Sequence, residues 1–417
     1  MRDDLLIVVP PYIDSVDFFL KHLPSGNVCF EGDWDNGAHR NFLHRGVDNY
    51  PSAPLLGVFT TGTTRTRPKL VLYSKVNVTT TVNGIFSFFD VDRIKYIFCY
   101  PAPFHVFGLI LGYFTSFFKN ITLIAEEGEF TPIAHQRWLD VGIEDRKNML
   151  TIGTPTHFKD LLYYVSKRDI VPTHSYSSVV GGAHVEKKLW HDLQKELKIE
   201  QPSIGYGCTE ASLGVTHLGP GEIPSVDGDI GYIVPGINAE YLSGHGDADG
   251  FRILAPSLCL AMIEDDALIF PSEYIIKDKM DCTIISGKPK FHFKGRTQNL
   301  LNRGGEKFSL DQIELLLKEQ LNIESVCLSI PHDRLGEELA ILIQRPFLPD
   351  ADQDQDQDQD LVNKIYYNLK NEYQKNFCAK NCFLVDEIPT NLNAKIDRHE
   401  SKRIIERCLN SFQYPQP

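Results

Sequence analysis

The sequence offers no disulfide framework and no clear metal-binding cluster. Its nine cysteines are scattered, and none forms a C-x-x-C pair. Cys378 and Cys382 are four residues apart, but no second pair with zinc-like spacing accompanies them. We therefore expect reduced thiols and no structural zinc site.

Long apolar runs and a secretory start are also missing. The first residues, MRDDLLIVVPPY, carry an acidic pair and only a short apolar run, whereas a secretory signal has a basic start and a longer apolar core. No uninterrupted apolar stretch reaches the length needed to cross a bilayer. We expect a cytoplasmic protein without a membrane span.

Positive charge is scarce, since the formal net charge is -13 over 417 residues. That balance disfavours binding to nucleic acid or to an anionic membrane surface. An acidic protein can still bind a nucleotide through local cations and backbone N–H groups. The 42% of hydrophobic residues suit a soluble globular protein with a substantial core.

Strand-like and helix-like segments alternate through the first 230 residues, which predicts an α/β architecture. The strand-like runs include LLGVFTT, KYIFCYPA, ITLIAEE, SYSSVVGGA and PSIGYGCTE, and HVEKKLWHDLQKELK has apolar residues at helical spacing. Residues 230–295 contain short strand-like runs with Gly-rich turns, which predict a small antiparallel β subdomain.

A smaller α+β domain is expected after a polar, Gly-containing link at residues 296–308. We place the boundary between domains 1–297 and 298–417. Ser309 and Gln312 have capping-box spacing and predict a helix over SLDQIELLLKEQL. The acidic repeat at 350–360 consists of Asp and Gln apart from Ala351 and cannot form a core, so we expect a disordered surface loop there.

The stretch FTTGTTRTRPK at 59–69 joins small and hydroxyl-bearing residues to a lysine. Such a loop offers backbone N–H groups, hydroxyls and one cation to a phosphate, although no Walker-type pattern is present. Taken alone, it could also be a polar turn after a strand.

Four further stretches carry candidate chemistry. They are YPAPFHVFGL at 100–109, YGCTE at 206–210, FHFKGRTQNLLNRGGEKFSLDQIE at 291–314 and IPTNLNAKIDR at 388–398. Tyr206 could stack on a base, Thr209 offers a hydroxyl, and Glu210 could hold Mg²⁺. Each stretch alone also fits a purely structural role, such as a buried histidine or a turn after a strand.

Together and in this order, the motifs resemble those of the adenylate-forming superfamily, which includes acyl- and aryl-CoA ligases, stand-alone adenylation domains and luciferases. The resemblance extends from about residue 59 to 398. It implies that a carboxylate attacks the α-phosphate of ATP to give an acyl-adenylate, and that a thiol then displaces AMP. It further implies a large N-terminal α/β domain and a small, mobile C-terminal α+β domain. ATP, Mg²⁺ and either CoA or a carrier-protein phosphopantetheine would be the cofactors and partners.

The resemblance also assigns residue roles. Lys395 would bridge the carboxylate and the α-phosphate, Glu210 would bind Mg²⁺, and His105 would lie between the acyl pocket and the thiol entrance. A ribose ligand would be Asp278, which we favour, or Asp281. The loop RGGEK at 303–307 would line the thiol channel after the C-terminal domain swings. The remaining nucleotide-binding set would be Thr60, Thr61, Gly62, Thr63, Thr64, Lys69, Gly181, Gly182, Ala183, Tyr206, Gly207, Thr209 and Arg296.

Several positions depart from the family pattern. Arg65, Thr66 and Arg67 replace the second glycine of the phosphate loop, and Ala394 precedes the lysine where glycine is usual. Gln298 stands at the hinge position. Only about 60 residues precede the phosphate loop, which predicts a truncated N-terminal domain most like that of o-succinylbenzoate-CoA ligase-type enzymes.

These departures leave two alternatives to an acyl- or aryl-CoA ligase. The first is a ligase that loads a carrier protein in a biosynthetic pathway. The second is a degenerate, non-catalytic partner subunit. The acid itself is not identified by the sequence.

Overall fold

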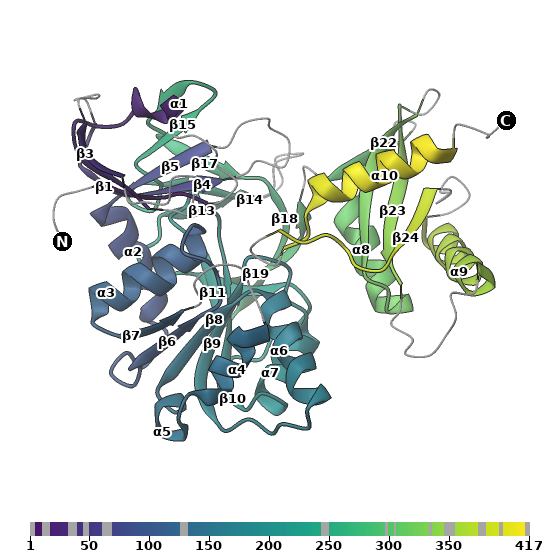
Figure 1. Ribbon diagram of the computed structural model, residues 1–417, viewed down its shortest axis with the longest axis horizontal. Coiled ribbons are helices and arrows are strands. Elements are labelled where there is room, and N and C mark those ends of the chain that lie inside the picture. Colours follow the sequence, from purple (N-terminus) through teal and green to yellow (C-terminus); the bar gives the residue numbers. More distant parts are fainter. Residues whose placement is uncertain are drawn as a thin grey trace.

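A mixed nine-stranded sheet forms the centre of the computed structural model of the protein (Figure 1). The structure describes residues 5–10, 17–31, 40–44, 50–60, 69–125, 132–242, 250–296, 299–303, 306–332, 336–345, 355–373, 381–391 and 395–412. In sheet order, the central strands are β18 (Asp278–Ile285), β19 (Lys288–Arg296), β12 (Asp229–Ile233), β11 (Thr216–Leu218), β10 (Ile199–Tyr206), β9 (Ser175–Gly181), β8 (Met149–Gly153), β6 (Tyr96–Cys99) and β7 (Thr122–Ala125).

The strands from β10 to β7 are parallel to one another, and helices cover both of their faces. Strands β8 and β9 are buried along their whole length, as expected for parallel strands with two covered faces. The flanking helical segments are α2 (Lys75–Phe86), η1 (Phe107–Phe114), α3 (Thr115–Lys119), α4 (Pro132–Asp140), α5 (Ile143–Arg146), α6 (Pro155–Lys167) and α7 (Lys187–Lys195).

Two apolar cores lie on opposite faces of this sheet. Val179 packs with Ile85 and Phe107 on the face covered by α2 and η1, whereas its neighbour Val180 packs with Leu189 of α7 on the other face. The alternation follows from the two-residue side-chain period of a strand. It decides which residues of β9, β10 and β11 face the cavity described below.

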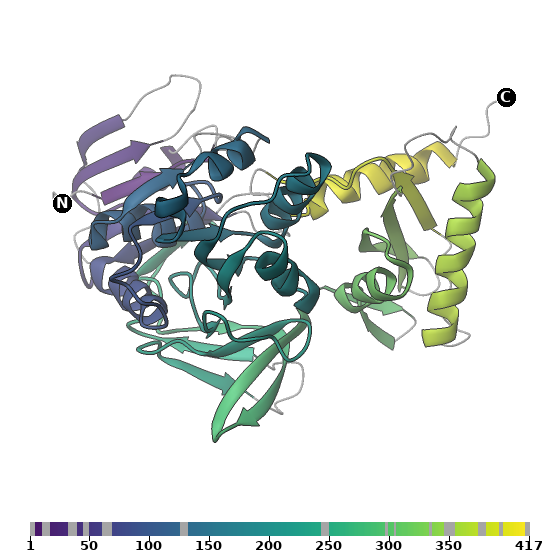
Figure 2. The ribbon, with the colours of Figure 1, turned by 90° about the horizontal axis from the view of Figure 1, so that it is seen from below.

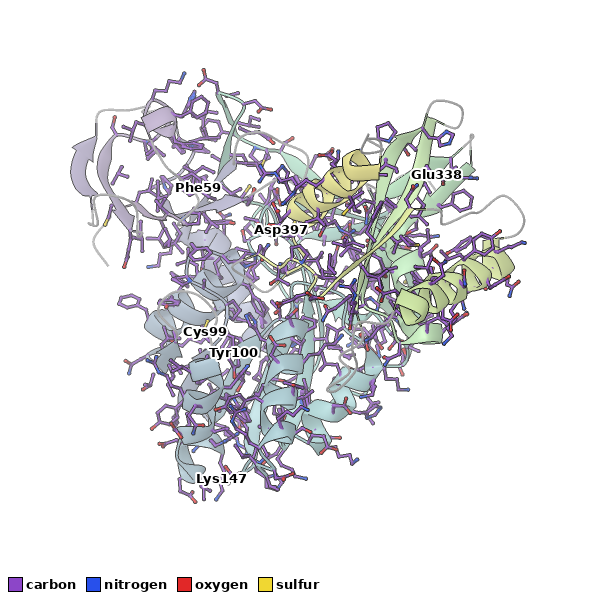
Figure 3. All side chains as sticks on the ribbon, turned by 45° about the vertical axis from the view of Figure 1, so that its right-hand side comes forward. Phe59, Cys99, Tyr100, Lys147, Glu338 and Asp397 are labelled. Atoms are coloured by element: carbon purple, nitrogen blue, oxygen red, sulfur yellow. The ribbon has the colours of Figure 1, made fainter. Side chains whose placement is uncertain are left out.

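Five strands of a second, seven-stranded sheet precede the central sheet along the chain, and the other two come from residues 261–269. In sheet order it consists of β16 (Ala267–Ile269), β15 (Ala261–Glu264), β5 (Lys69–Ser74), β4 (Pro54–Thr60), β1 (Leu5–Val8), β2 (Gly26–Glu31) and β3 (Arg40–His44), and α1 (Asp17–Leu20) lies between β1 and β2 in the chain. Phe59, labelled in Figure 3, is buried in this part of the molecule. Strands β4 and β5 pair antiparallel up to Thr60 and Lys69, so the phosphate-loop motif connects the two strands of a hairpin.

The α/β fold class is confirmed, and residues 230–295 form the expected antiparallel pairs. A small sheet contains β13 (Ala239–Leu242), β14 (Gly250–Leu254) and β17 (Glu273–Ile276). Strands β12, β18 and β19 from the same region instead extend the central sheet, and Figure 2 shows the teal and green strands of this region at the bottom of the view.

A separate sheet with its own core follows residue 298. It contains β21 (Glu306–Ser309), β20 (Leu300–Arg303), β23 (Gly336–Gln344), β22 (Ser325–His332) and β24 (Asn381–Val385), and its helices are α8 (Leu310–Leu321), α9 (Gln355–Tyr373) and α10 (Arg398–Phe412). Helix α8 begins as predicted, since the Ser309 hydroxyl accepts from the Gln312 N–H at 3.3 Å. Figure 1 shows this part beside the rest of the chain. The boundary at 297/298 stays a prediction.

The expectation of a disordered loop at 350–360 is wrong for its second half. Helix α9 begins at Gln355 and continues through the acidic repeat, whereas residues 350–354 lie outside the described residues. Acidic side chains are favourable in the first turns of a helix, where the backbone dipole is positive. The repeat also precedes an amphipathic segment that buries Ile365 and Leu369 against the C-terminal sheet. That packing holds the whole helix.

Candidate functional site

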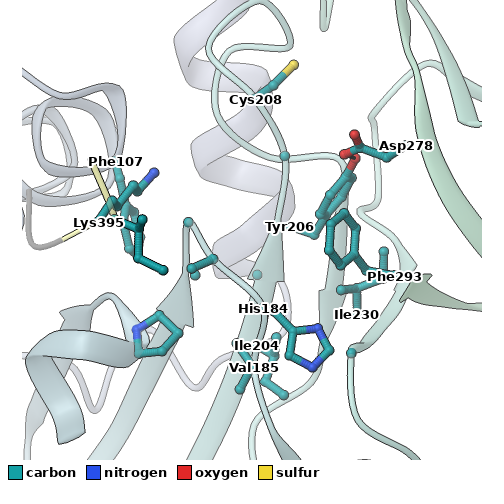
Figure 4. Close-up of a pocket in the computed structure, with 18 of the residues that line it drawn as sticks. Phe107, His184, Val185, Ile204, Tyr206, Cys208, Ile230, Asp278, Phe293 and Lys395 are labelled. Atoms are coloured by element: carbon teal, nitrogen blue, oxygen red, sulfur yellow. Dashed lines mark hydrogen bonds between the residues drawn. The ribbon is translucent and has the colours of Figure 1, made fainter. Parts of the chain in front are cut away.

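A connected cavity of about 1990 Å³ lies at the end of the central sheet, and the C-terminal part of the chain supplies one of its walls. Strand ends and turns of the central sheet form the opposite wall. Figure 4 shows the side chains that point into it, with Lys395 and Phe107 on one side and Tyr206, Asp278 and Phe293 on the other. Each predicted motif contributes described residues to the lining of this cavity. The side chain of Arg296 lies outside the described part of the chain.

The turn after β9 receives the side chain of Lys395. Gly181 ends the strand, and Gly182 follows with φ +84°, a backbone conformation that favours glycine. A Cβ atom at position 182 would lie 3.0 Å from Nζ of Lys395. Lys395 comes from the segment just before α10, whose first residue follows Asp397 (Figure 3). The last predicted motif thus reaches residues 181–183, here called the GGA motif, and Ala183 also lines the cavity.

His105 lies in the turn that leads into η1. The N–H of Phe107 donates to Nδ1 of His105 at 3.2 Å, and the N–H of Leu109 donates to the His105 carbonyl at 2.8 Å. Burial lowers the pKa of His105 well below its usual value, and the positive charge of Lys395 lowers it further. The imidazole is therefore neutral at physiological pH.

Gly108 explains the glycine of the FHVFG motif. A Cβ atom there would lie 2.3 Å from the carbonyl oxygens of both Pro101 and Ala102. Only glycine allows η1 to begin this close to the preceding turn, so the motif fixes the position of His105.

Tyr206 and Asp278 are joined across the cavity wall. The Tyr206 hydroxyl donates to a carboxylate oxygen of Asp278 at 2.6 Å (Figure 4). Asp278 pairs with Arg296 in the β18–β19 ladder. Asp281, the other candidate, is exposed, lies 3.4 Å from Nζ of Lys294 and does not line the cavity.

Lys69 and Glu210 form an ion pair inside the cavity. Glu210 is 8% exposed, and the carbonyl of the preceding residue, Thr209, accepts from the Tyr73 hydroxyl at 2.8 Å. Burial, followed by the charge of Glu210, raises the pKa of Tyr274, whose ring lies 5.8 Å from Nζ of Lys69. The first and third motifs therefore meet through a compact charged pair.

Gly207 allows the sharp turn that positions Glu210. A Cβ atom at this position would lie 1.8 Å from the carbonyl oxygen of Leu213, which no other residue type tolerates. The backbone alone therefore requires the glycine of the YGCTE motif, and its predicted nucleotide contact stays a prediction.

The described residues contain no group of three or more His, Cys, Asp or Glu side chains that could bind one metal ion. Mg²⁺ bound to a nucleotide needs only one or two carboxylates, because phosphates and waters complete its shell. The buried carboxylate of Glu210, which lines the cavity, fits that requirement.

Several predicted positions lie outside the described residues. In the phosphate loop, Thr60 and Lys69 are described, and the loop between them is not. The predicted positions outside the described part are therefore Thr61, Gly62, Thr63, Thr64, Arg65, Thr66 and Arg67 of this loop, together with Gln298, Gly304, Gly305, Cys378 and Ala394. Arg303 of the RGGEK loop pairs with Glu338, with Nε 2.7 Å from Oε1.

Sequence reasoning missed several cavity residues, including His184, Cys208, Phe293 and His217. His184 directly follows the GGA motif and could have been found from that position. His217 lies in a short strand seven positions after Glu210, and no local pattern marks it.

No helix among the described residues is long and apolar enough to cross a membrane.

Comparison with known proteins finds a matching family model and related acyl-CoA ligases. A family model described as "AMP-binding enzyme" matches residues 25–248 of this chain. The acyl-CoA ligase sidI of Aspergillus fumigatus is 26% identical over 296 residues, which are 67% of this chain and 49% of that protein. The chain spans about half the length of such curated relatives.

Solved structures share the fold at low sequence identity. Escherichia coli MenE with bound OSB-AMS has a TM-score of 0.67 and 14% identity, covering 97% of this chain and 88% of that chain. McyG A-PCP complexed with phenylalanyl-adenylate also has a TM-score of 0.67 and 14% identity, covering 92% of this chain and 63% of that chain.

Proposed function

The chain belongs to the AMP-binding enzymes, the adenylate-forming superfamily, and from that premise we propose that it activates a carboxylic acid with ATP and transfers the acyl group to the thiol of CoA. One observation carries the proposal. Nζ of Lys395 lies against Gly182 in the same cavity as the Tyr206–Asp278 hydrogen bond and the Lys69–Glu210 pair. A cation, a nucleotide-sized space and a buried carboxylate thus converge.

In the first step, a carboxylate oxygen of the acid attacks the α-phosphorus of ATP. The bond from that phosphorus to the bridging oxygen of pyrophosphate breaks, and the products are the acyl-adenylate and pyrophosphate. Little covalent chemistry is left to the protein, so positioning and charge stabilisation dominate. Lys395 would neutralise the two anions that must approach each other at Gly182.

The nucleotide would lie along the opposite wall. Tyr206 would stack on adenine, Asp278 and Arg296 would hold the ribose, and Thr209 would contact the α-phosphate. The location of Asp278 on the cavity wall supports it as the ribose ligand, because Asp281 is exposed and paired elsewhere.

The triphosphate would separate the Lys69–Glu210 pair. Glu210 would hold Mg²⁺, which supplies positive charge to the phosphates when bound. Lys69 and the 60–64 segment would then hold the β- and γ-phosphates. In the absence of nucleotide, the ion pair keeps both buried charges neutralised.

In the second step, the thiolate attacks the acyl carbonyl carbon and the bond to the AMP oxygen breaks. Lys395 occupies the cavity in the present arrangement, which supports this arrangement as the one for adenylation. We propose that domain 298–417 moves against domain 1–297 between the steps, and that the loop RGGEK then lines the thiol channel. His105, neutral and next to the Lys395 site, would lie between the acid and the entering thiol.

A carrier-protein phosphopantetheine is the alternative acceptor, since it presents the same thiol arm as CoA. The similarity to McyG A-PCP complexed with phenylalanyl-adenylate supports keeping this alternative. A non-catalytic partner subunit is opposed by the convergence of Lys395, Glu210 and Lys69 in one cavity.

The test is pyrophosphate release by the full chain with ATP, Mg²⁺ and a library of carboxylic acids. Lys395→Ala should reduce release by roughly 10²–10³-fold, the usual effect of removing one group that stabilises developing charge. The same variant should still convert a synthetic acyl-adenylate and CoA into thioester. Tight ATP binding without release for any acid would refute the proposal, and thioester formation with a carrier protein but not CoA would favour the alternative.

A further inference from the structure

His217 is a fully buried histidine whose two ring nitrogens have no hydrogen-bond partner among the described residues. Its ring lies between two aromatic neighbours, with centroids 5.0 Å from Phe88 and 5.7 Å from Phe89. Burial lowers its pKa to about 3, so the ring is neutral at physiological pH. A neutral imidazole presents one N–H donor and one acceptor nitrogen, and here both are unused.

The position of His217 in the sheet connects it to the reaction centre. Gly181 of β9 pairs with Gly205 of β10, and Gly205 pairs with His217 of β11. Residues paired in register project to the same face, so these three positions form a row across the sheet. The row starts beside Gly182, against which Lys395 lies.

The two glycines leave a strip of space along this row. A Cβ atom on Gly205 would lie 3.4 Å from Cγ1 of Val179 and 3.5 Å from Nδ1 of His217. A Cβ atom on Gly181 would lie 2.9 Å from the carbonyl oxygen of Gly205 and 3.6 Å from Cζ of Phe107, so a side chain here would close this end of the strip. All five of these residues line the main cavity, and the strip is therefore continuous with the site of Lys395.

An unpartnered imidazole in an apolar pocket is unfavourable, because a buried polar group without a hydrogen bond has lost its water and gained nothing. Leucine or phenylalanine would pack against Phe88 and Phe89 without that penalty. We therefore expect a ligand that occupies the strip to supply the hydrogen-bond partner of His217.

We propose that this strip is the acyl channel and that His217 recognises a hydroxyl group at the distal end of the acid. The inference rests on the proposed adenylation. A hydroxyl both donates and accepts, so it matches both functions of a neutral imidazole. A carboxylate at that end would require a positively charged partner, whereas burial keeps the His217 ring neutral.

The sheet geometry limits the length of the acid. Two strand spacings of ~4.8 Å separate position 181 from position 217, which gives roughly 10 Å. An extended chain covers about 3.5 Å for every three bonds, so roughly eight bonds fit. The inferred substrates are short to medium-length hydroxy acids.

The experiment compares ω-hydroxylated and unsubstituted straight-chain acids of six to ten carbons in pyrophosphate release. The full chain should prefer the hydroxylated acid of the matching length at least tenfold in kcat/KM. His217→Phe, which retains an aromatic ring beside Phe88 and Phe89, should lose that preference or reverse it. His217→Asn, whose amide keeps a donor and an acceptor near the Nδ1 position, should retain part of it.

Calorimetric binding of the two acyl-sulfamoyl-adenosine analogues should give the same ratio without turnover. Failure of every acid to release pyrophosphate would refute the proposed function, whereas release with an unchanged ratio in His217→Phe would refute only this inference. A wild-type preference for the unsubstituted acid would refute it as well. Should His217→Phe fail to fold, the wild-type ratio itself decides.

Discussion

Nζ of Lys395 lies 3.0 Å from the point where a side chain would begin on Gly182. The lysine follows β24, the last strand of the C-terminal sheet, and the glycine follows β9, the fourth central strand from the β7 edge. Their meeting requires the C-terminal part to face the cavity as it does here. The relationship leads directly to a test.

Gly182→Ala should displace Lys395 and slow adenylation by about 10–100-fold, with ATP binding little changed. The added methyl group would occupy the space next to the ammonium group. Pyrophosphate release and ATP affinity should be measured in parallel. Gly287→Ala is the matched control, because Gly287 has a similar φ of +79° but nothing within 4 Å of its Cβ position. Both variants carry backbone strain of ~1–2 kcal/mol, and only the first touches the site. Equal activity of the two would contradict the role of the turn.

Tyr206→Phe keeps the ring for stacking and removes the hydroxyl that donates to Asp278. A hydrogen bond to a charged group contributes about 1.5–3 kcal/mol, so the KM for ATP should rise roughly 10–100-fold. Asp278→Asn should act in the same direction. Asp281→Asn serves as the control and should change the KM less than twofold, since Asp281 is exposed. A larger effect at 281 than at 278 would reverse the assignment of the ribose ligand.

Stability should fall as the pH falls from 7 to 5, because several histidines are buried in the neutral form. Burial lowers the pKa of His135 to about 4 and that of His157 to about 3. The unfolded chain binds these protons near pH 6.5 and the folded chain does not, so each histidine lowers the unfolding free energy by about 2 kcal/mol between pH 6.5 and 5. Urea unfolding at several pH values should show this slope.

The variant His135→Gln should have a smaller pH dependence than the wild type. His174→Gln changes an exposed histidine and should leave the slope as it is. Equal slopes for all three proteins would show that the buried ring is not the source.

The acidic repeat supplies a test of helix α9. Asp360→Pro places proline inside the helix and should cost about 3 kcal/mol, because one backbone hydrogen bond is lost and the ring clashes with the preceding turn. Gln355→Pro places it at the first helical position, where proline is tolerated. Denaturant midpoints compare the two. Nearly equal values would indicate that the repeat is a loop after all.

Some features of the protein follow from local sequence. The apolar period of HVEKKLWHDLQKELK predicts α7, and the spacing of Ser309 and Gln312 predicts the start of α8, because helix period and capping depend on residues a few positions apart. The acidic repeat misled the same reasoning. Its composition alone indicates disorder, and only the burial of Ile365 and Leu369 against the distant C-terminal sheet explains the helix.

The order of the motifs determined the family, and therefore the set of residues to compare. Tertiary structure decided how they meet: Lys395 against Gly182, Lys69 with Glu210, and Tyr206 with Asp278 rather than Asp281. It alone placed His217 in one row with Gly181 and Gly205. Such contacts depend on strand order and register across separate segments, and no local period in a sequence encodes them.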